Sequence, residues 1–153
     1  MSAQLIYSIN QGLAFAGMLA DTHDHDIVSR SIETVAGADF GIVVGRGTNA
    51  DKQVVIGGAL TVFLGLTVRS LERENVNNGT VKYSEKETAG IMRRGYIYAV
   101  CPAGCVPGDV VKYTTATGIV DAGAAGAGEA LVPGATWEST AVAGALAIVR
   151  IVS

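Results

Sequence analysis

The sequence is poor in charged side chains, which limits the partners that it can attract. Only 16% of its residues are Asp, Glu, Lys or Arg, whereas soluble domains contain about 25%. A surface with so few charges indicates that part of it faces protein rather than water. The net charge is −3, and Arg93 and Arg94 form the only adjacent basic pair. Neither feature creates a broad positive field, so we expect no binding to nucleic acid and none to a membrane surface.

Cysteine is nearly absent, which excludes a disulfide framework. Cys101 and Cys105 are the only two cysteines, and they lie in the sequence CPAGC. Their three-residue spacing is not that of a zinc knuckle unless further ligands come from elsewhere. We interpret them as reduced thiols that flank a turn, with a local disulfide between them as the alternative.

Histidine is equally scarce. The two histidines, His23 and His25, lie in DTHDHDIVSR, where aspartates alternate with them. Two imidazoles can begin a metal site, but a third protein ligand would have to come from elsewhere. The spacing matches no established metal-binding motif. We therefore expect a polar turn that follows the apolar N-terminal residues.

The motifs of catalysis are also absent. The sequence contains no G-x-S-x-G nucleophile motif. The glycine-rich run GAAGAG at 123–128 lacks the Lys-Ser/Thr pair of a phosphate-binding loop. We therefore predict that the protein is not an enzyme, and we assign no catalytic, cofactor-binding or metal-binding residue.

The first twenty residues contain no charged side chain. They lack the basic start of a secretory signal, and polar residues such as Gln4 and Gln11 interrupt their apolar run. They also fall short of the roughly 20 predominantly apolar residues that span a membrane. We expect residues 1–38 to form an N-terminal arm and a polar turn that pack on partners.

Small residues are what the chain has in abundance. It contains 22 alanines and 20 glycines but only nine aromatic side chains. The core is therefore thin for this length, because large side chains carry most of the buried area, and assembly would add stability. Alanine and glycine concentrate at 118–137, which we expect to be a surface loop or a segment ordered by a neighbour.

Patterns typical of β-strands dominate the rest of the chain. Short apolar runs rich in β-branched residues are separated by glycine-containing or Pro-Gly turns, at 40–47, 53–68, 75–83, 90–100 and 106–113. Runs of this length between frequent turns favour a sandwich or small barrel. Helical patterns are few, with two turns possible at 29–37.

The C-terminal residues predict a further strand. Ile148, Arg150 and Val152 fall on one face of an extended chain, and Val149 and Ile151 fall on the other. The predicted fold is thus all-β, a small β-barrel or sandwich with an extended N-terminal arm and little helix. We place the β-rich domain at 39–153.

Taken together, six segments resemble the structural cement proteins of tailed bacteriophages, which are also called capsid decoration proteins. Their order and spacing match that family over nearly the whole chain, at LAFAGMLADT (13–22), DIVSRSIE (26–33), FLGLTVRSLE (63–72), MRRGYIYAV (92–100), VPGDVVKY (106–113) and LVPGATWESTAVAGALAIVRI (131–151). Each segment alone is weakly specific, and the set carries the resemblance.

The resemblance implies a virion structural protein that is made in the bacterial host cytoplasm. Such a protein binds the outer surface of the phage head and stabilises the lattice of the major capsid protein. It would also associate with itself, as a homodimer or a homotrimer. The family has no catalytic residues to carry over. The alternatives are another virion β protein (a tail, baseplate or receptor-binding part) and, less favoured, a ligand-binding or metal-dependent β-barrel enzyme.

Large side chains supply most interface energy, and this guides the choice of candidate contact residues. In the uncharged N-terminal segment we select Leu5, Tyr7, Phe15 and Met18 as apolar anchors for a partner. Trp137, the only tryptophan, is the next candidate.

Overall fold

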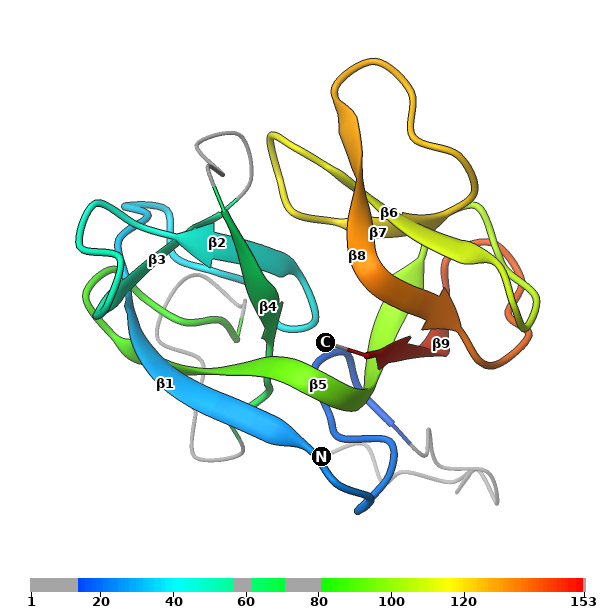
Figure 1. Ribbon diagram of the computed structural model, residues 1–153, viewed down its shortest axis with the longest axis horizontal. Coiled ribbons are helices and arrows are strands. Elements are labelled where there is room, and N and C mark those ends of the chain that lie inside the picture. The colour runs from blue at the N-terminus through cyan, green and yellow to red at the C-terminus, as the bar shows by residue number, and fades with distance from the viewer. Residues whose placement is uncertain (1–13, 57–61, 71–80, 153) are drawn as a thin grey trace, which may run out of the picture.

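A computed structural model describes residues 14–56, 62–70 and 81–152 of the chain. This part of the chain contains no helix, and its strands are shown in Figure 1: β1 (Asp26–Ile32), β2 (Val43–Arg46), β3 (Gln53–Ile56), β4 (Phe63–Thr67), β5 (Thr88–Cys101), β6 (Val110–Thr114), β7 (Val120–Ala122), β8 (Glu129–Trp137) and β9 (Ala145–Ile151). The prediction of an all-β fold is confirmed. No helix in the described ranges is long and apolar enough to cross a membrane.

Strands β1 to β4 and the first half of β5 form a closed five-stranded barrel, on the left of Figure 1. The strand order β1-β3-β2-β4-β5 returns to its start, because β5 also pairs with β1. Strands β1 and β3 are parallel and the other pairs are antiparallel. Large apolar side chains fill the interior, among them Ile32, Phe40, Val54, Tyr83 and Ile91. Closure leaves this barrel without an exposed strand edge.

The second half of β5 belongs to another antiparallel sheet, on the right of Figure 1, with the order β5-β9-β8-β6-β7. Its core surrounds Trp137, which is fully buried. The alternation predicted for the last strand is confirmed, since Val149 and Ile151 are buried while Arg150 and Val152 face outward.

Strand β5 joins the two sheets. It is 14 residues long, and it pairs with β1 and β4 around Met92 but with β9 from Gly95 onward. Gly95 has a φ of 132°, and a Cβ built there would lie 2.9 Å from the Cβ of His25. A glycine is therefore required where β5 changes partners. The two sheets consequently share one continuous backbone.

The low-complexity stretch 118–137 is more ordered than predicted. The expectation of a surface loop is wrong for most of its length, because it contains β7 and β8. Backbone hydrogen bonds hold these strands whatever the side chains, and small residues allow close approach. A Cβ at Gly134 would lie only 2.1 Å from the carbonyl oxygen of Val152.

The N-terminal part of the domain also differs from its prediction. The stretch 29–37 forms the end of β1 and a turn, so the expectation of two helical turns is wrong. Strand β1 pairs with both β3 and β5, so residues 26–32 form part of the wall of the first barrel. Among the described residues, 14–25 precede the first barrel strand, and the division of the chain at residue 38 stays a prediction.

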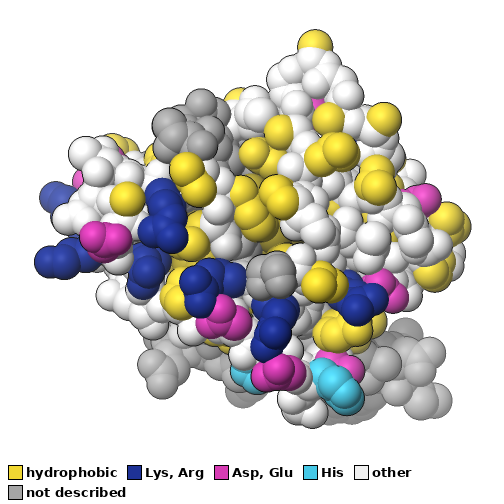
Figure 2. All heavy atoms as spheres, viewed as in Figure 1, with side chains coloured by type: hydrophobic (Ala, Val, Ile, Leu, Met, Phe, Trp, Pro, Cys, Tyr) yellow, Lys and Arg dark blue, Asp and Glu magenta, His cyan; other side chains and the backbone are white. Residues whose placement is uncertain are grey.

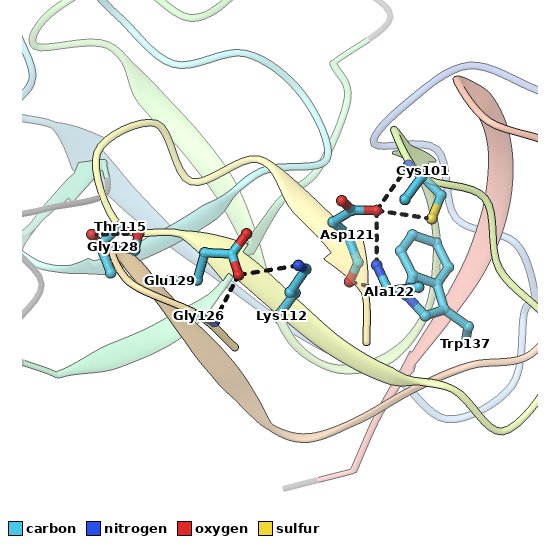
Figure 3. A network of polar contacts seen from close by, with 10 residues as sticks. Cys101, Lys112, Thr115, Asp121, Ala122, Gly126, Gly128, Glu129 and Trp137 are labelled. Atoms are coloured by element: carbon cyan, nitrogen blue, oxygen red, sulfur yellow. Dashed lines mark hydrogen bonds and ion pairs between the residues drawn. The ribbon is translucent and has the colours of Figure 1, made fainter. Parts of the chain in front are cut away.

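Side-chain contacts connect the strands of the second sheet, as Figure 3 shows. An Asp121 carboxylate oxygen accepts hydrogen bonds from the backbone N–H groups of Ala103 (3.0 Å) and Ala122 (2.9 Å). The Asp121 carbonyl oxygen accepts one from the Trp137 indole at 3.2 Å. Lys112 on β6 pairs with Glu129 on β8 at 3.0 Å. These contacts join β7 to the end of β5, and β6 to β8.

Candidate interaction surface

The residues that follow the uncharged N-terminal segment are fixed against β5. The backbone N–H of Gly17 donates to the carbonyl oxygen of Tyr98 at 2.7 Å, and that of Ala20 donates to Tyr96 at 2.9 Å. The N–H of Tyr98 donates in return to Met18 at 2.9 Å. Residues 17–20 thus add a short antiparallel segment to the free side of β5. The residues just before them are therefore attached to the domain at a fixed point.

Phe15 lies just before this fixed point and is 56% exposed. The guanidinium of Arg69 is stacked on it, with the central carbon 4.8 Å from the Phe15 ring centre and 5.0 Å from that of Phe40. Cation–π contacts of this kind hold an aromatic ring in place without burying it. Phe15 is therefore a positioned, accessible apolar side chain, as an interface anchor must be.

A hollow of about 410 Å³ lies beside this stack, and its walls are mostly apolar. Phe40 and Ile42 contribute from the first barrel, and Val100 and Ile119 from the region of β5 and β7. Arg69 and Asp39 are the charged residues of its lining. A hollow of this size and polarity can accept one or two apolar side chains of a protein partner.

The predicted anchor residues have different environments. Phe15 is exposed, as described, whereas Met18 is half-buried and its sulfur accepts a hydrogen bond from the Phe15 N–H at 3.2 Å. Leu5 and Tyr7 lie outside the described residues. Trp137 is a core residue, so its side chain is not available to a partner in this conformation, and we no longer include it.

Sequence reasoning missed Arg69. Its aromatic neighbours Phe15 and Phe40 are distant from it in sequence. The contact depends on residues 17–20 packing against β5, where the Arg69 backbone N–H donates to Gly17 at 2.7 Å. No local sequence pattern indicates that packing.

The His-Asp segment forms an exposed bend before β1. Its carboxylates are engaged by arginines of β5, since Arg94 pairs with Asp24 at 2.7 Å and Arg93 pairs with Asp26. Within the described ranges, no three His, Cys, Asp or Glu side chains gather closely enough to hold a metal ion. The segment therefore connects the N-terminal residues to the first barrel through ion pairs.

Both cysteines are buried free thiols. Burial raises the pKa of the Cys101 thiol to about 12, with a smaller contribution from neighbouring Cys105. Burial also raises the pKa of Cys105. The Cys101 thiol donates to the Asp121 carboxylate at 3.5 Å, and Cys105 donates to the carbonyl oxygen of Ser139 at 3.3 Å. Protonated, buried thiols are poor nucleophiles, so these cysteines have a packing role.

An exposed, positioned aromatic ring beside an apolar hollow is typical of a surface that contacts another protein. Comparison with known proteins gives the family. The family model described as "Structural cement protein (E217 gp24/Pam3 gp6)" matches residues 3–152. The chain belongs to this family, which confirms the resemblance seen in its sequence.

A solved structure entitled "The capsid of Myoviridae Phage XM1" contains a chain with the same fold. The two chains share 16% sequence identity with a TM-score of 0.75, and the alignment covers 99% of this chain and 98% of that one. No curated protein matches. This protein is therefore a structural protein that associates with a phage capsid in the virion and stabilises it. The role of its family is structural rather than enzymatic.

Proposed function

We propose that the protein binds the outer surface of the assembled phage head, where it contacts neighbouring subunits of the major capsid protein. The exposed Phe15 ring, held by Arg69 beside an apolar hollow, is the observation that carries the proposal. The uncharged segment before it, with Leu5 and Tyr7, would extend the contact from its fixed point on β5. Together these apolar side chains would form the attachment region.

Such binding stabilises the head by two physical routes. A ligand that binds only the assembled lattice shifts the equilibrium towards assembly by mass action. A ligand that contacts several subunits also gains from effective concentration, so individually modest contacts add up to firm attachment. Where the footprint exists only after the subunits reach their mature positions, binding favours the mature lattice.

Self-association completes the proposal. We expect a homodimer or a homotrimer, since closed symmetry is usual for assemblies of identical chains. Synthesis in the host cytoplasm would precede attachment to the head. Sedimentation equilibrium of the purified protein gives the number of copies directly, and a strictly monomeric protein at all concentrations would contradict this part.

Co-sedimentation with purified heads tests the attachment. We expect the protein to pellet with expanded heads that lack it and to bind unexpanded heads less. Phe15→Ser should weaken binding to expanded heads by about tenfold, because interface aromatics are often dominant contacts. Val142→Ser is the matched control, since Val142 is 77% exposed and lines none of the hollows described for this chain. Binding to tails instead of heads would establish the alternative of a tail or baseplate protein.

A further inference from the structure

Three adjoining hollows on another face of the molecule meet at Val152. Their volumes are about 510, 420 and 200 Å³, and Val152 lines all three. The first two hollows also share Pro133 and Gly134, and the last two share Arg150. We call this combined region the Val152 surface. None of its lining residues lines the hollow beside Phe15.

The centre of the Val152 surface is apolar and accessible. Val110, Leu131 and Val152 are each about half-exposed, at 45%, 52% and 49%. They come from the neighbouring strands β6 and β8 and from the residue after β9. Exposed aliphatic side chains that adjoin one another mark a contact surface for another protein.

Arginines line the hollows that adjoin these aliphatic side chains. Four of them line the three hollows, Arg46, Arg93, Arg94 and Arg150, together with two aspartates, Asp24 and Asp26. With His23 neutral, the net side-chain charge of the lining is +2, on a chain whose total is −3. Figure 2 shows positively charged side chains in a row across this face, with acidic side chains between them and hydrophobic side chains beside them. Four of the eleven Lys and Arg residues of the chain therefore line this one surface.

The arginines keep donor groups for a partner. Among the described residues, the Arg46 guanidinium makes one hydrogen bond, to the carbonyl oxygen of Ala50 at 2.8 Å. Arg150 forms an ion pair with Glu138 at 3.9 Å, which is too long for a hydrogen bond, and its guanidinium carbon lies 5.9 Å from the Tyr96 ring centre. A guanidinium carries five N–H donors and binds carboxylates through two of them at once. Arg46 and Arg150 can therefore each donate hydrogen bonds to a carboxylate of a partner.

We propose that the Val152 surface docks an acidic segment of the capsid shell, in which carboxylates flank apolar side chains. The proposal rests on the proposed function and adds a second attachment region to it. Apolar side chains would enter the hollows around Val152, and carboxylates would pair with Arg46 and Arg150. Because this surface and the Phe15 region share no residue, one copy of the protein can contact two parts of the lattice.

The charge distribution selects an acidic shell segment over other occupants. A second copy docked through the same surface would place one positive patch against another, because a twofold interface brings a patch onto itself. Nucleic acid would match the arginines but would leave the aliphatic centre without a partner. An acidic protein segment with apolar residues satisfies both parts of the surface.

Charge reversal at Arg46 tests the proposal. The dissociation constant of the protein for expanded heads should rise about tenfold in Arg46→Glu, and less at high salt. Arg46→Lys keeps the charge but loses the paired donors, so it should bind more tightly than Arg46→Glu and more weakly than the unchanged protein, which separates charge from folding. Lys86→Glu is the matched control, because it makes the same change in net charge at an exposed turn that lines none of the three hollows.

The outcomes are distinguishable. Unaltered head binding by Arg46→Glu, or equal weakening by Lys86→Glu, would overturn the proposal while leaving head binding intact. If the unchanged protein fails to bind heads at all, the proposed function itself fails. Loss of self-association in Arg46→Glu by sedimentation velocity would assign the surface to a second copy. Loss of binding to linear duplex DNA, with head binding unchanged, would assign it to nucleic acid. Either result would replace the acidic shell segment as the occupant.

Discussion

The two sheets of this molecule achieve closure by different means. In the first barrel, the first half of β5 (residues 88–94) pairs with β1, so the backbone ladder itself returns to its start. In the second sheet, the described strands show no pairing between β7 and β5. There the Asp121 carboxylate reaches from β7 to Cys101 and to Ala103, just beyond the end of β5. Side-chain contacts between β7 and the end of β5 therefore take the place of the backbone hydrogen bonds that would close this sheet into a barrel.

This difference shows how a chain rich in alanine and glycine can complete a second sheet. Main-chain hydrogen bonds need no large side chains, and a few well-placed polar contacts can connect the strands that remain unpaired. The same difference predicts unequal responses to substitution. Contacts that close the second sheet should be individually replaceable at modest cost, whereas the apolar residues of each core should not.

Trp137→Ala should have the largest effect. Trp137 is fully buried in the core of the second sheet, and removing such a side chain costs about 3 to 5 kcal/mol of unfolding free energy. Since β5 belongs to both sheets, we expect backbone amides of β2 and β3 to lose protection together with those of β8. Hydrogen exchange measures this, and a first barrel that stays protected would show that the sheets unfold independently.

Ile91→Ala is the matched test from the first barrel. Ile91 is fully buried there, and we expect a loss of about 2 to 5 kcal/mol. The only tryptophan lies in the other sheet, so its fluorescence reports on that sheet during denaturation. The Trp137 signal should change at a lower denaturant concentration in this variant. An unshifted tryptophan transition would contradict the coupling through β5.

Gly17→Ala should have an intermediate effect, because it acts where residues 17–20 join β5. Gly17 has a φ of 82°, and a Cβ there would lie 2.7 Å from the Cβ of Phe40. We expect a loss of about 2 kcal/mol from backbone strain and crowding together. Gly144→Ala is the control, since Gly144 has a φ of 79° with no atom near the added Cβ, and should lose only about 1 kcal/mol. Denaturant unfolding of both variants separates crowding from strain, and equal losses would refute the crowding.

Asp121→Ala should cost less, about 1 to 2 kcal/mol, because it leaves the N–H groups of Ala103 and Ala122 without their acceptor. Asp121→Asn keeps an amide oxygen at this position and should recover much of the loss. Thermal unfolding of the two variants makes the comparison. If alanine were harmless here, the second sheet would not depend on this contact.

The smallest effect concerns the pH dependence of stability. The backbone N–H of Gly126, and then Lys112, lower the pKa of Glu129 below its ordinary value of 4.5. The ionised carboxylate therefore stabilises the fold above that pH, and this contribution is lost as the pH falls through the lowered pKa. Glu129→Gln should flatten the acid limb of the stability curve, whereas the exposed control Glu85→Gln should not. Denaturant unfolding between neutral pH and about pH 3 measures this pH dependence. An acid limb that Glu129→Gln leaves unchanged would show that the contacts of Glu129 with Gly126 and Lys112 do not contribute to stability.

Local patterns predicted much of the fold. The alternation of Val149 and Ile151 with Arg150 and Val152 identified a half-buried strand, and the Pro-Gly-Asp sequence at 107–109 correctly preceded β6. These features depend on neighbours in the chain. They can therefore be read from the sequence.

Other features depend on residues that are distant in sequence. The two-sheet arrangement arises because Gly95 lets β5 exchange β1 for β9, and a lone glycine within an apolar run does not indicate that exchange. The Arg69 stack and the grouping of Arg46 with Arg150 are likewise produced by the topology. Phe15 could be selected from the sequence as a large apolar residue in an uncharged segment, but the sequence could not show that it is held exposed.

The temperature at which filled heads release their DNA tests the central claim most directly. Heads that lack this protein should release DNA at a higher temperature as it is added back, until the sites are saturated. A protein carrying both Phe15→Ser and Arg46→Glu should produce little of this rise, because both attachment regions are then weakened. A release temperature that the unchanged protein does not alter would contradict the account.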